Sequence, residues 1–186
     1  MNDAPVISVV IPAHNADPFL QRAVAALLAS DLPRNRWEII IVDDASTGRP
    51  PKISGADSVL EIHGTPQGPA AARNLGAEAA RAPLVAFVDA DVSVRPDALS
   101  RFVEHFRRDA KLAAVFGSYD DTPTDPDFIS QYRNLLHHYV HQQKSGEVDS
   151  FWAGCGAVRR AAFLDVGMFD AARYTTPQIE DIELGY

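Results

Sequence analysis

Segments that favour strands alternate with segments that favour helices along the first 116 residues, and no other feature constrains the fold as strongly. Short apolar runs rich in β-branched residues predict buried strands. These runs are Val6–Ile11, Trp37–Val42, Val59–Ile62, Leu84–Val88 and Ala113–Phe116. The helices predicted between them are one capped by Asp17 with Pro18 at its first position, one from the turn at 65–69 to about Arg81, and one from about Asp97 to Asp109. This alternation is typical of an α/β fold, with a Rossmann-like, mostly parallel sheet flanked by helices on both faces.

The alternation ends at residues 120–127, which are rich in proline and aspartate. A long amphipathic helix is predicted from about Asp127 to Gln143, followed by a strand at Phe151–Val158 and a last helix starting at Thr176-Pro177. The apolar side chains predicted to share one face of the long helix are Phe128, Tyr132, Leu135 and Tyr139, widened by Ile129, Leu136 and Val140. We therefore expect a single domain over 1–186, with halves at 1–119 and 120–186.

The composition restricts the partners and the compartment. The formal net charge of −8 is opposite to the basic surface of a nucleic-acid-binding protein, so no nucleic-acid partner is expected. Cys155 is the one cysteine, so no internal disulfide can form, which favours a reducing compartment. No apolar run approaches the ~20 residues of a membrane-spanning helix, and no basic leader precedes an apolar segment at the start. A cytoplasmic protein is the expectation.

The strand predicted at Leu84–Val88 ends in two carboxylates, those of Asp89 and Asp91. Residues two apart on an extended chain point to the same side, so this pair can share one hard cation. Oxygen ligands suit magnesium or manganese best. Taken alone, a pair with this spacing is more often two solvated acids in a loop. Its interpretation depends on the other motifs.

Three predicted strands end in polar or acidic residues, at Pro12-Ala13-His14-Asn15, Asp43-Asp44-Ala45-Ser46 and Asp89-Ala90-Asp91. Parallel strands bring such ends to one edge of a sheet, where α/β proteins bind their ligands. Together with later segments they form the series VVIPAHN, IIIVDDAS, GPAAARNLG, VAFVDADV, WAGCGAVRRAAFLDVGMFD and EDIELGY. In this order and over nearly the whole chain, the series resembles family 2 glycosyltransferases of the GT-A fold. The resemblance implies sugar transfer from a nucleoside-diphosphate donor, with UDP-sugars expected.

The resemblance also implies roles on the donor side. Asp44 matches the acid that accepts a hydrogen bond from a uracil ring, and Pro12, Ala13 and His14 match the segment that lines the base and ribose. His14 stands where the family usually has tyrosine. Roles for the remaining three residues follow in the same way: Arg73 matches a nucleotide or diphosphate contact, Asp89 an acid near the ribose and metal, and Asp91 the direct ligand of Mn²⁺ or Mg²⁺.

On the acceptor side, Asp181 matches the general base of the inverting members. A positioned carboxylate makes a hydroxyl nucleophilic by taking its proton, so the acceptor is expected to be a glycan, a glycolipid or another hydroxyl compound. Trp152, Gly154 and Glu180 match the acceptor-side segment, and Trp152 could stack on a sugar face. Family catalytic domains usually continue past Glu180-Asp181. We therefore expect the chain to be part of a longer polypeptide, which leaves membrane association through a further segment open.

Plainer interpretations stay open at each position. Asp44 could cap the loop after its strand, Arg73 could be a surface charge, and Trp152 could be a core residue. Asp181 and its acidic neighbours could simply favour a helix start. Two other classes also compete: a phospho-acceptor receiver domain, with Lys144 poorly placed for its lysine, and a relative that binds sugar nucleotides without catalysis.

Two further clusters have bland interpretations that we prefer. His137 and His141 have the i, i+4 spacing of zinc ligands but lack a third ligand at a suitable spacing. The acids between Asp120 and Asp127 lack the glycine and the spacing of a calcium loop, so a solvated loop is expected there. The sequence specifies neither the sugar, nor the acceptor, nor the oligomeric state.

Overall fold

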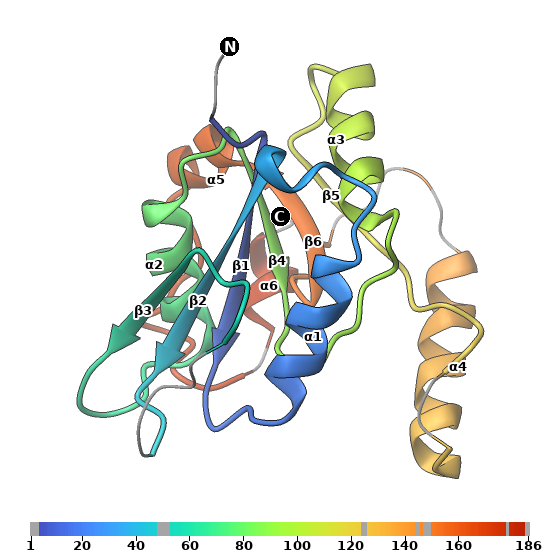
Figure 1. Cartoon of the computed structure of the whole chain (residues 1–186), viewed down its shortest axis with the longest axis horizontal. Helices are drawn as coiled ribbons and strands as arrows, with labels where there is room; N and C mark the ends of the chain where they lie inside the picture. The colour runs from blue at the N-terminus through green and yellow to red at the C-terminus, as the bar shows by residue number, and fades with distance from the viewer. Residues whose placement is uncertain are drawn as a thin grey trace.

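The computed structural model describes residues 4–47, 53–123, 126–143, 146, 150–177 and 179–184. Within this part of the chain, a six-stranded sheet has the order β3-β2-β1-β4-β6-β5 (Figure 1). Its strands are β1 (Ile7–Ala13), β2 (Trp37–Asp44), β3 (Ser58–Ile62), β4 (Leu84–Val88), β5 (Ala114–Phe116) and β6 (Cys155–Arg159). The first four run parallel, whereas β6 is antiparallel to both β4 and β5. The expectation of a mostly parallel α/β sheet is confirmed.

Helices cover both faces of the sheet (Figure 1). They are α1 (Phe19–Leu28), α2 (Pro69–Ala79), α3 (Ala98–Arg108), α4 (Phe128–Gln143), α5 (Arg160–Asp165) and α6 (Glu180–Leu184), with a 3₁₀ turn at Arg34–Arg36. Alternate side chains of β1 point to opposite faces. Val9 therefore joins the core under α1 and α3, whereas Val10 joins the core under α2 and α5. Two apolar layers hold the sheet between the helices.

Small residues on α2 let this helix lie close to the sheet. A Cβ atom added at Gly76 would lie 2.3 Å from Cγ1 of Val10, so no larger residue fits there without a shift of the helix. Ala72 and Ala77 on the same helix are fully buried. The close approach brings Arg73 of α2 next to the carboxyl ends of the strands, where the candidate site is built.

The position of the last two strands differs from what simple alternation suggests. The strand after α3 is β5, which does not pair directly with β4. Strand β6 lies between β4 and β5 and pairs antiparallel with each. Val88 pairs with Cys155 in this register, and Phe116 pairs with Gly156. A segment from the last quarter of the chain is thus inserted beside the strand that ends in Asp89.

Three predicted boundaries are wrong. Asp17 does not cap α1: Pro18 occupies the cap position, no side-chain cap bond forms, and the Asp17 carboxylate accepts from Nε2 of Gln21 at 3.2 Å. The strand predicted from Phe151 begins only at Cys155, and Phe151 and Ala153 before it are buried in the core under α2. The last helix begins at Glu180 rather than near Thr176, because the backbone at 175–176 packs against Gly68.

Helix α4 is amphipathic as predicted, but its apolar face is exposed. The exposed side chains are Phe128, Ile129, Tyr132, Leu135, Leu136, Tyr139 and Val140. The opposite, polar face is turned to the body of the protein, where Nδ1 of His138 donates to the carbonyl oxygen of Tyr119 at 2.6 Å. Figure 1 shows this helix standing apart from the sheet.

No helix in the described ranges combines the length and the hydropathy needed to cross a lipid bilayer.

Candidate functional site at the carboxyl edge of the sheet

The predicted edge of the sheet is present, because β1, β2 and β4 are adjacent and parallel and so end on the same side. Ala13 and Asp43 are partners at the last paired position of β1 and β2. Directly beyond them, Nδ1 of His14 donates to the carbonyl oxygen of Asp44 at 2.6 Å. Pro12 is half-buried, Ala13 is buried and His14 is exposed. The three residues predicted to line a base and ribose therefore form one continuous rim with the end of β2.

Asp44 is buried at this rim and uses both carboxylate oxygens. Oδ1 accepts from the backbone N–H of Gln67 and Oδ2 from that of Gly68, each at 2.7 Å. Gly68 has a φ of +89°, and a Cβ there would lie 2.5 Å from the carbonyl oxygen of Thr175, so this turn requires glycine. Asp44 thus anchors the turn before α2 instead of capping the loop after β2. That loop is bonded to Asp43, whose carboxylate accepts from the backbone N–H and the hydroxyl of Ser46.

Arg73 is not a surface charge: its side chain is only 6% exposed. Its Nη2 donates to Oδ1 of Asp89 at 2.7 Å, and its Nη1 donates to Oε1 of Glu180 at 2.9 Å. The Glu180 side chain is 5% exposed and that of Asp89 is 36% exposed. A single guanidinium thus joins the end of β4 to the start of α6.

Asp91 lies at the same edge but is exposed. Within the described part of the chain its carboxylate has no hydrogen-bond or ion-pair partner, whereas Asp89 is held by Arg73. Those residues include no cluster of three or more metal-ligating side chains. A magnesium-like ion is commonly held by one or two carboxylates together with substrate phosphates and waters, and Asp89 and Asp91 fit that mode of binding.

Asp181 is half-buried on α6. Its Oδ2 accepts from the backbone N–H of Ala153 at 3.2 Å and its Oδ1 from that of Ile182 at 2.9 Å. Burial raises the pKa of this carboxyl, and the adjacent charge of Glu180 raises it further, against a lowering by the two N–H groups and Arg73. A higher pKa makes the ionised carboxylate a better proton acceptor.

The acceptor-side segment also reaches this edge. The carbonyl oxygen of Gly154 accepts from the backbone N–H of Asp89 at 3.1 Å. A Cβ at Gly154 would lie 2.6 Å from Nε1 of Trp152, so the glycine makes room for the indole. The ring of Tyr119 is stacked between Trp152, at 4.9 Å, and His137, at 5.1 Å. Trp152 is therefore engaged in an aromatic stack that fastens α4.

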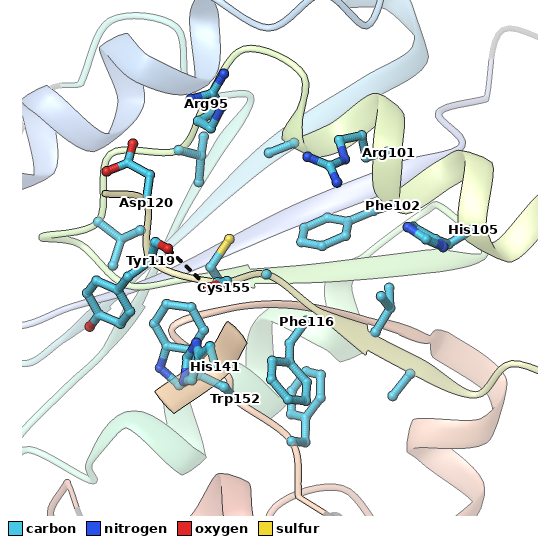
Figure 2. A pocket seen from close by; sticks show the side chains of 18 of the residues that line it. Arg95, Arg101, Phe102, His105, Phe116, Tyr119, Asp120, His141, Trp152 and Cys155 are labelled. Carbon is cyan, nitrogen blue, oxygen red and sulfur yellow. Dashed lines mark hydrogen bonds between the residues drawn. The ribbon is translucent and has the colours of Figure 1, made fainter. Parts of the chain in front are cut away.

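A groove of about 1470 Å³ starts at Asp91 and is lined by α3, β5 and α4. Figure 2 shows Arg101 and His105 of α3 on one side of it and Tyr119 and Trp152 on the other. Sequence reasoning missed Tyr119, although it lies soon after the end of β5 (Ala114–Phe116). His141, also in the groove, packs against Phe116 and Trp152. His137 and His141 thus both pack against aromatic rings.

A parallel sheet with acidic strand ends, and a further carboxylate brought to the same edge by a distant helix, is the arrangement of α/β proteins that bind ligands at the carboxyl edge of the sheet. The chain belongs to glycosyl transferase family 2, whose sequence model matches residues 8–167. This membership confirms the resemblance and overturns the alternative of a phospho-acceptor receiver domain.

Curated relatives support the assignment at moderate identity. A glycosyltransferase of Haemophilus influenzae is 31% identical over 121 residues, which are 62% of this chain and 47% of that protein. The succinoglycan biosynthesis protein ExoO of Rhizobium meliloti is 33% identical over 119 residues, 62% of this chain and 33% of that protein. The chain thus spans half or less of the length of these two relatives.

Solved structures share the fold. The chain superposes with a TM-score of 0.73 on Staphylococcus aureus TarS 1–349 in complex with UDP, at 18% identity, over 96% of this chain and 53% of that one. The mannosyltransferase PcManGT from Pyrobaculum calidifontis, in complex with GDP-Man and Mn²⁺, gives a TM-score of 0.68 at 22% identity, over 97% of this chain and 51% of that one. The protein has the GT-A fold of these glycosyltransferases.

Proposed function

We propose that the chain is the catalytic domain of an inverting glycosyltransferase that moves a sugar from a nucleoside-diphosphate donor to a hydroxyl acceptor. The observation that carries the proposal is the reach of Arg73, which bonds both Asp89 of the acid pair and Glu180, the neighbour of Asp181. Asp89 of the acid pair and Glu180, the sequence neighbour of the candidate base, therefore lie within the span of one side chain. In this proposal 1–119 binds the donor and 120–186 supplies the acceptor side.

The charges at the edge support a divalent cation, Mn²⁺ or Mg²⁺, at Asp91 and Asp89. The acids there outnumber Arg73, whose charge is already paired with two of them. An anionic diphosphate would be repelled unless a cation came with it. When bound, such a cation neutralises the diphosphate and stabilises the departing nucleoside diphosphate. PcManGT and GalNAc-T7, two structural neighbours, were each crystallised with Mn²⁺.

The rim formed by Pro12, Ala13, His14 and Asp44 suits a nucleoside. UDP is the nucleotide that we propose, because a carboxylate accepts a hydrogen bond from the ring N–H that uracil offers and cytosine lacks. Each Asp44 oxygen keeps acceptor capacity beyond its one backbone bond. TarS, a structural neighbour, was crystallised with UDP and with UDP-GlcNAc.

Asp181 acts as the general base in the proposed mechanism. Its carboxylate takes the proton of the acceptor hydroxyl while that oxygen attacks the anomeric carbon from the side opposite to the leaving diphosphate. Direct displacement of this kind inverts the anomeric configuration. The acceptor is a glycan, a glycolipid or another hydroxyl compound, and Trp152, Gly154 and the groove beyond Asp91 are proposed to border it. The lone cysteine supports a reducing compartment, the cytoplasm.

The metal assignment predicts that Asp91→Asn weakens Mn²⁺-dependent UDP binding by roughly ten- to a hundred-fold, because one charge-assisted contact is lost. Isothermal titration calorimetry with UDP, with and without Mn²⁺, measures the effect. Asp109→Asn, at an exposed acid on the far side of the same groove, is the matched control and should bind like the parent. Equal Mn²⁺-dependent affinities in Asp91→Asn and the parent would remove Asp91 from the metal site.

The donor assignment predicts that Asp44→Asn lowers UDP affinity and narrows the preference for UDP over CDP. The amide of asparagine has one acceptor oxygen in place of two, so it cannot serve both backbone N–H groups and the uracil as the carboxylate can. Titrations of UDP and CDP against both proteins measure the preference. An unchanged ratio, in a variant that still folds, would show that Asp44 only anchors the turn before α2.

A further inference from the structure

We infer that Glu180 is a positioning residue: through Arg73 it holds α6, and with it the Asp181 carboxylate, in a defined place relative to Asp89. The inference rests on the proposed function for its catalytic consequence, but its structural part does not. This positioning role stands in place of the acceptor contact that the family resemblance implies for Glu180.

The described residues of helix α6 are Glu180–Leu184, and a helix in a protein takes most of its stability from tertiary packing rather than from its own propensity. Its position therefore depends on tertiary contacts. Glu183 pairs with Arg173 at the surface, and surface pairs contribute little. Asp181 accepts a rather long bond from Ala153. The Glu180–Arg73 pair has both side chains almost completely buried, and breaking a buried ion pair is costly.

Arg73 is itself held in place by its surroundings, so it can fix Glu180 relative to Asp89. Its helix is packed tightly on β1 through Gly76, and its guanidinium lies over the ring of Phe169 at 5.7 Å. The planar fork of arginine fixes two carboxylates in defined directions, which a lysine could not do. One of these carboxylates is on Asp89 and the other is on Glu180, 107 residues away from Arg73 in the sequence.

The consequence is a mechanical connection between the two halves of the proposed reaction centre. Asp89 precedes the exposed metal-ligand candidate Asp91 by two residues, and Glu180 precedes the candidate base by one. A displacement of about 1 Å between a base and the reacting atoms can cost roughly a hundred-fold in rate. Glu180 thus supports catalysis without a contact to either substrate.

Amide hydrogen exchange of the whole chain tests the structural part without any activity. In Glu180→Gln the N–H group of Ala153, which donates to Asp181, and the amides of α6 should exchange roughly ten- to a hundred-fold faster than in the parent. The amides of β1 and β4 should be unchanged. Glu183→Gln is the matched control, because it makes the same substitution on the same helix at the exposed pair, and should leave Ala153 as in the parent.

Unchanged exchange at Ala153 and α6 in Glu180→Gln would overturn the inference. If that variant loses protection in β1 and β4 as well, Glu180→Asp replaces it. Aspartate keeps the charge but is shorter, so it should speed exchange at Ala153 and α6 alone. Protection equal to the parent in Glu180→Asp would also overturn the inference.

Hydrolysis of UDP-GlcNAc in the presence of Mn²⁺ tests the catalytic part. Glu180→Gln should lower turnover roughly ten- to a hundred-fold while UDP affinity changes little. The adjacent negative charge raises the pKa of Asp181, so its removal should also move the acid limb of the pH–rate profile to lower pH. A purely structural residue would leave that limb in place. If the parent neither binds UDP nor hydrolyses its sugars, the proposed function fails, while the exchange experiment still decides the role of Glu180.

Discussion

Replacement of Asp181 by asparagine should lower sugar transfer by roughly 10²–10⁴-fold, the usual contribution of a general base. Asparagine keeps the size of the side chain and one acceptor oxygen, which can serve the N–H of Ala153 but not also that of Ile182, and it cannot take a proton. UDP affinity should stay close to that of the parent, because Asp181 is proposed to act on the acceptor and not on the nucleotide. Initial rates of transfer and calorimetry with UDP and Mn²⁺ separate the two effects.

The pH dependence provides a second measurement on the same variant. Burial raises the pKa of Asp181 above its ordinary value of 3.8, so the active, ionised form is lost on acidification at a pH above that value. The acid limb of the parent should therefore lie above pH 3.8 and be absent from the residual activity of Asp181→Asn. Ionisation of Asp181 favours activity but lowers the stability of the fold. A carboxyl whose pKa is higher in the folded than in the unfolded state destabilises the protein when it is ionised at neutral pH. The melting temperature of Asp181→Asn should not fall.

The stereochemical outcome is the control on mechanism. Magnetic resonance of the product should show the anomeric configuration opposite to that of the donor. Retained configuration, or near-normal turnover in Asp181→Asn, would mean that a different residue is the base. Glu183→Gln, on the same helix, should transfer at the rate of the parent.

Replacement of Arg73 by methionine should destabilise the protein by about 3–5 kcal/mol, the usual cost of removing one partner from a buried ion pair. Methionine fills much of the volume, so the loss reports the uncompensated carboxylates of Glu180 and Asp89 more than a cavity. Equilibrium unfolding in urea measures the effect. Arg173→Met is the control, because it removes the guanidinium of the exposed ion pair with Glu183. It should lower the free energy of unfolding by less than about 1 kcal/mol.

A double variant separates charge from packing. If the loss comes from an unpaired buried carboxylate, Glu180→Gln added to Arg73→Met should recover part of the stability, because it removes the charge left alone. A double variant at least as unstable as Arg73→Met would assign the loss to packing against Phe169 instead.

Local patterns determined the architecture and the chemistry of its edge. The apolar runs that became β1, β2 and β4 are short and β-branched, and the polar residues after them fall at the carboxyl edge because parallel strands end on the same side. The placement of Asp44, Asp89 and Asp91 at one edge was therefore predictable. Helix α4 was predictable too, because the spacing of its apolar residues is helical whether its apolar face is buried or exposed.

Tertiary structure alone decided which partners these residues meet. Arg73 has the sequence context of an ordinary helical arginine, yet it is buried because α2 approaches β1 through Gly76 and α6 supplies Glu180 from far along the chain. The insertion of β6 between β4 and β5, and the outward turn of the apolar face of α4, depend equally on distant segments. Periodicity reports which face of an element is apolar, but burial and pairing are properties of two elements together, and their meeting is encoded in no single stretch of sequence.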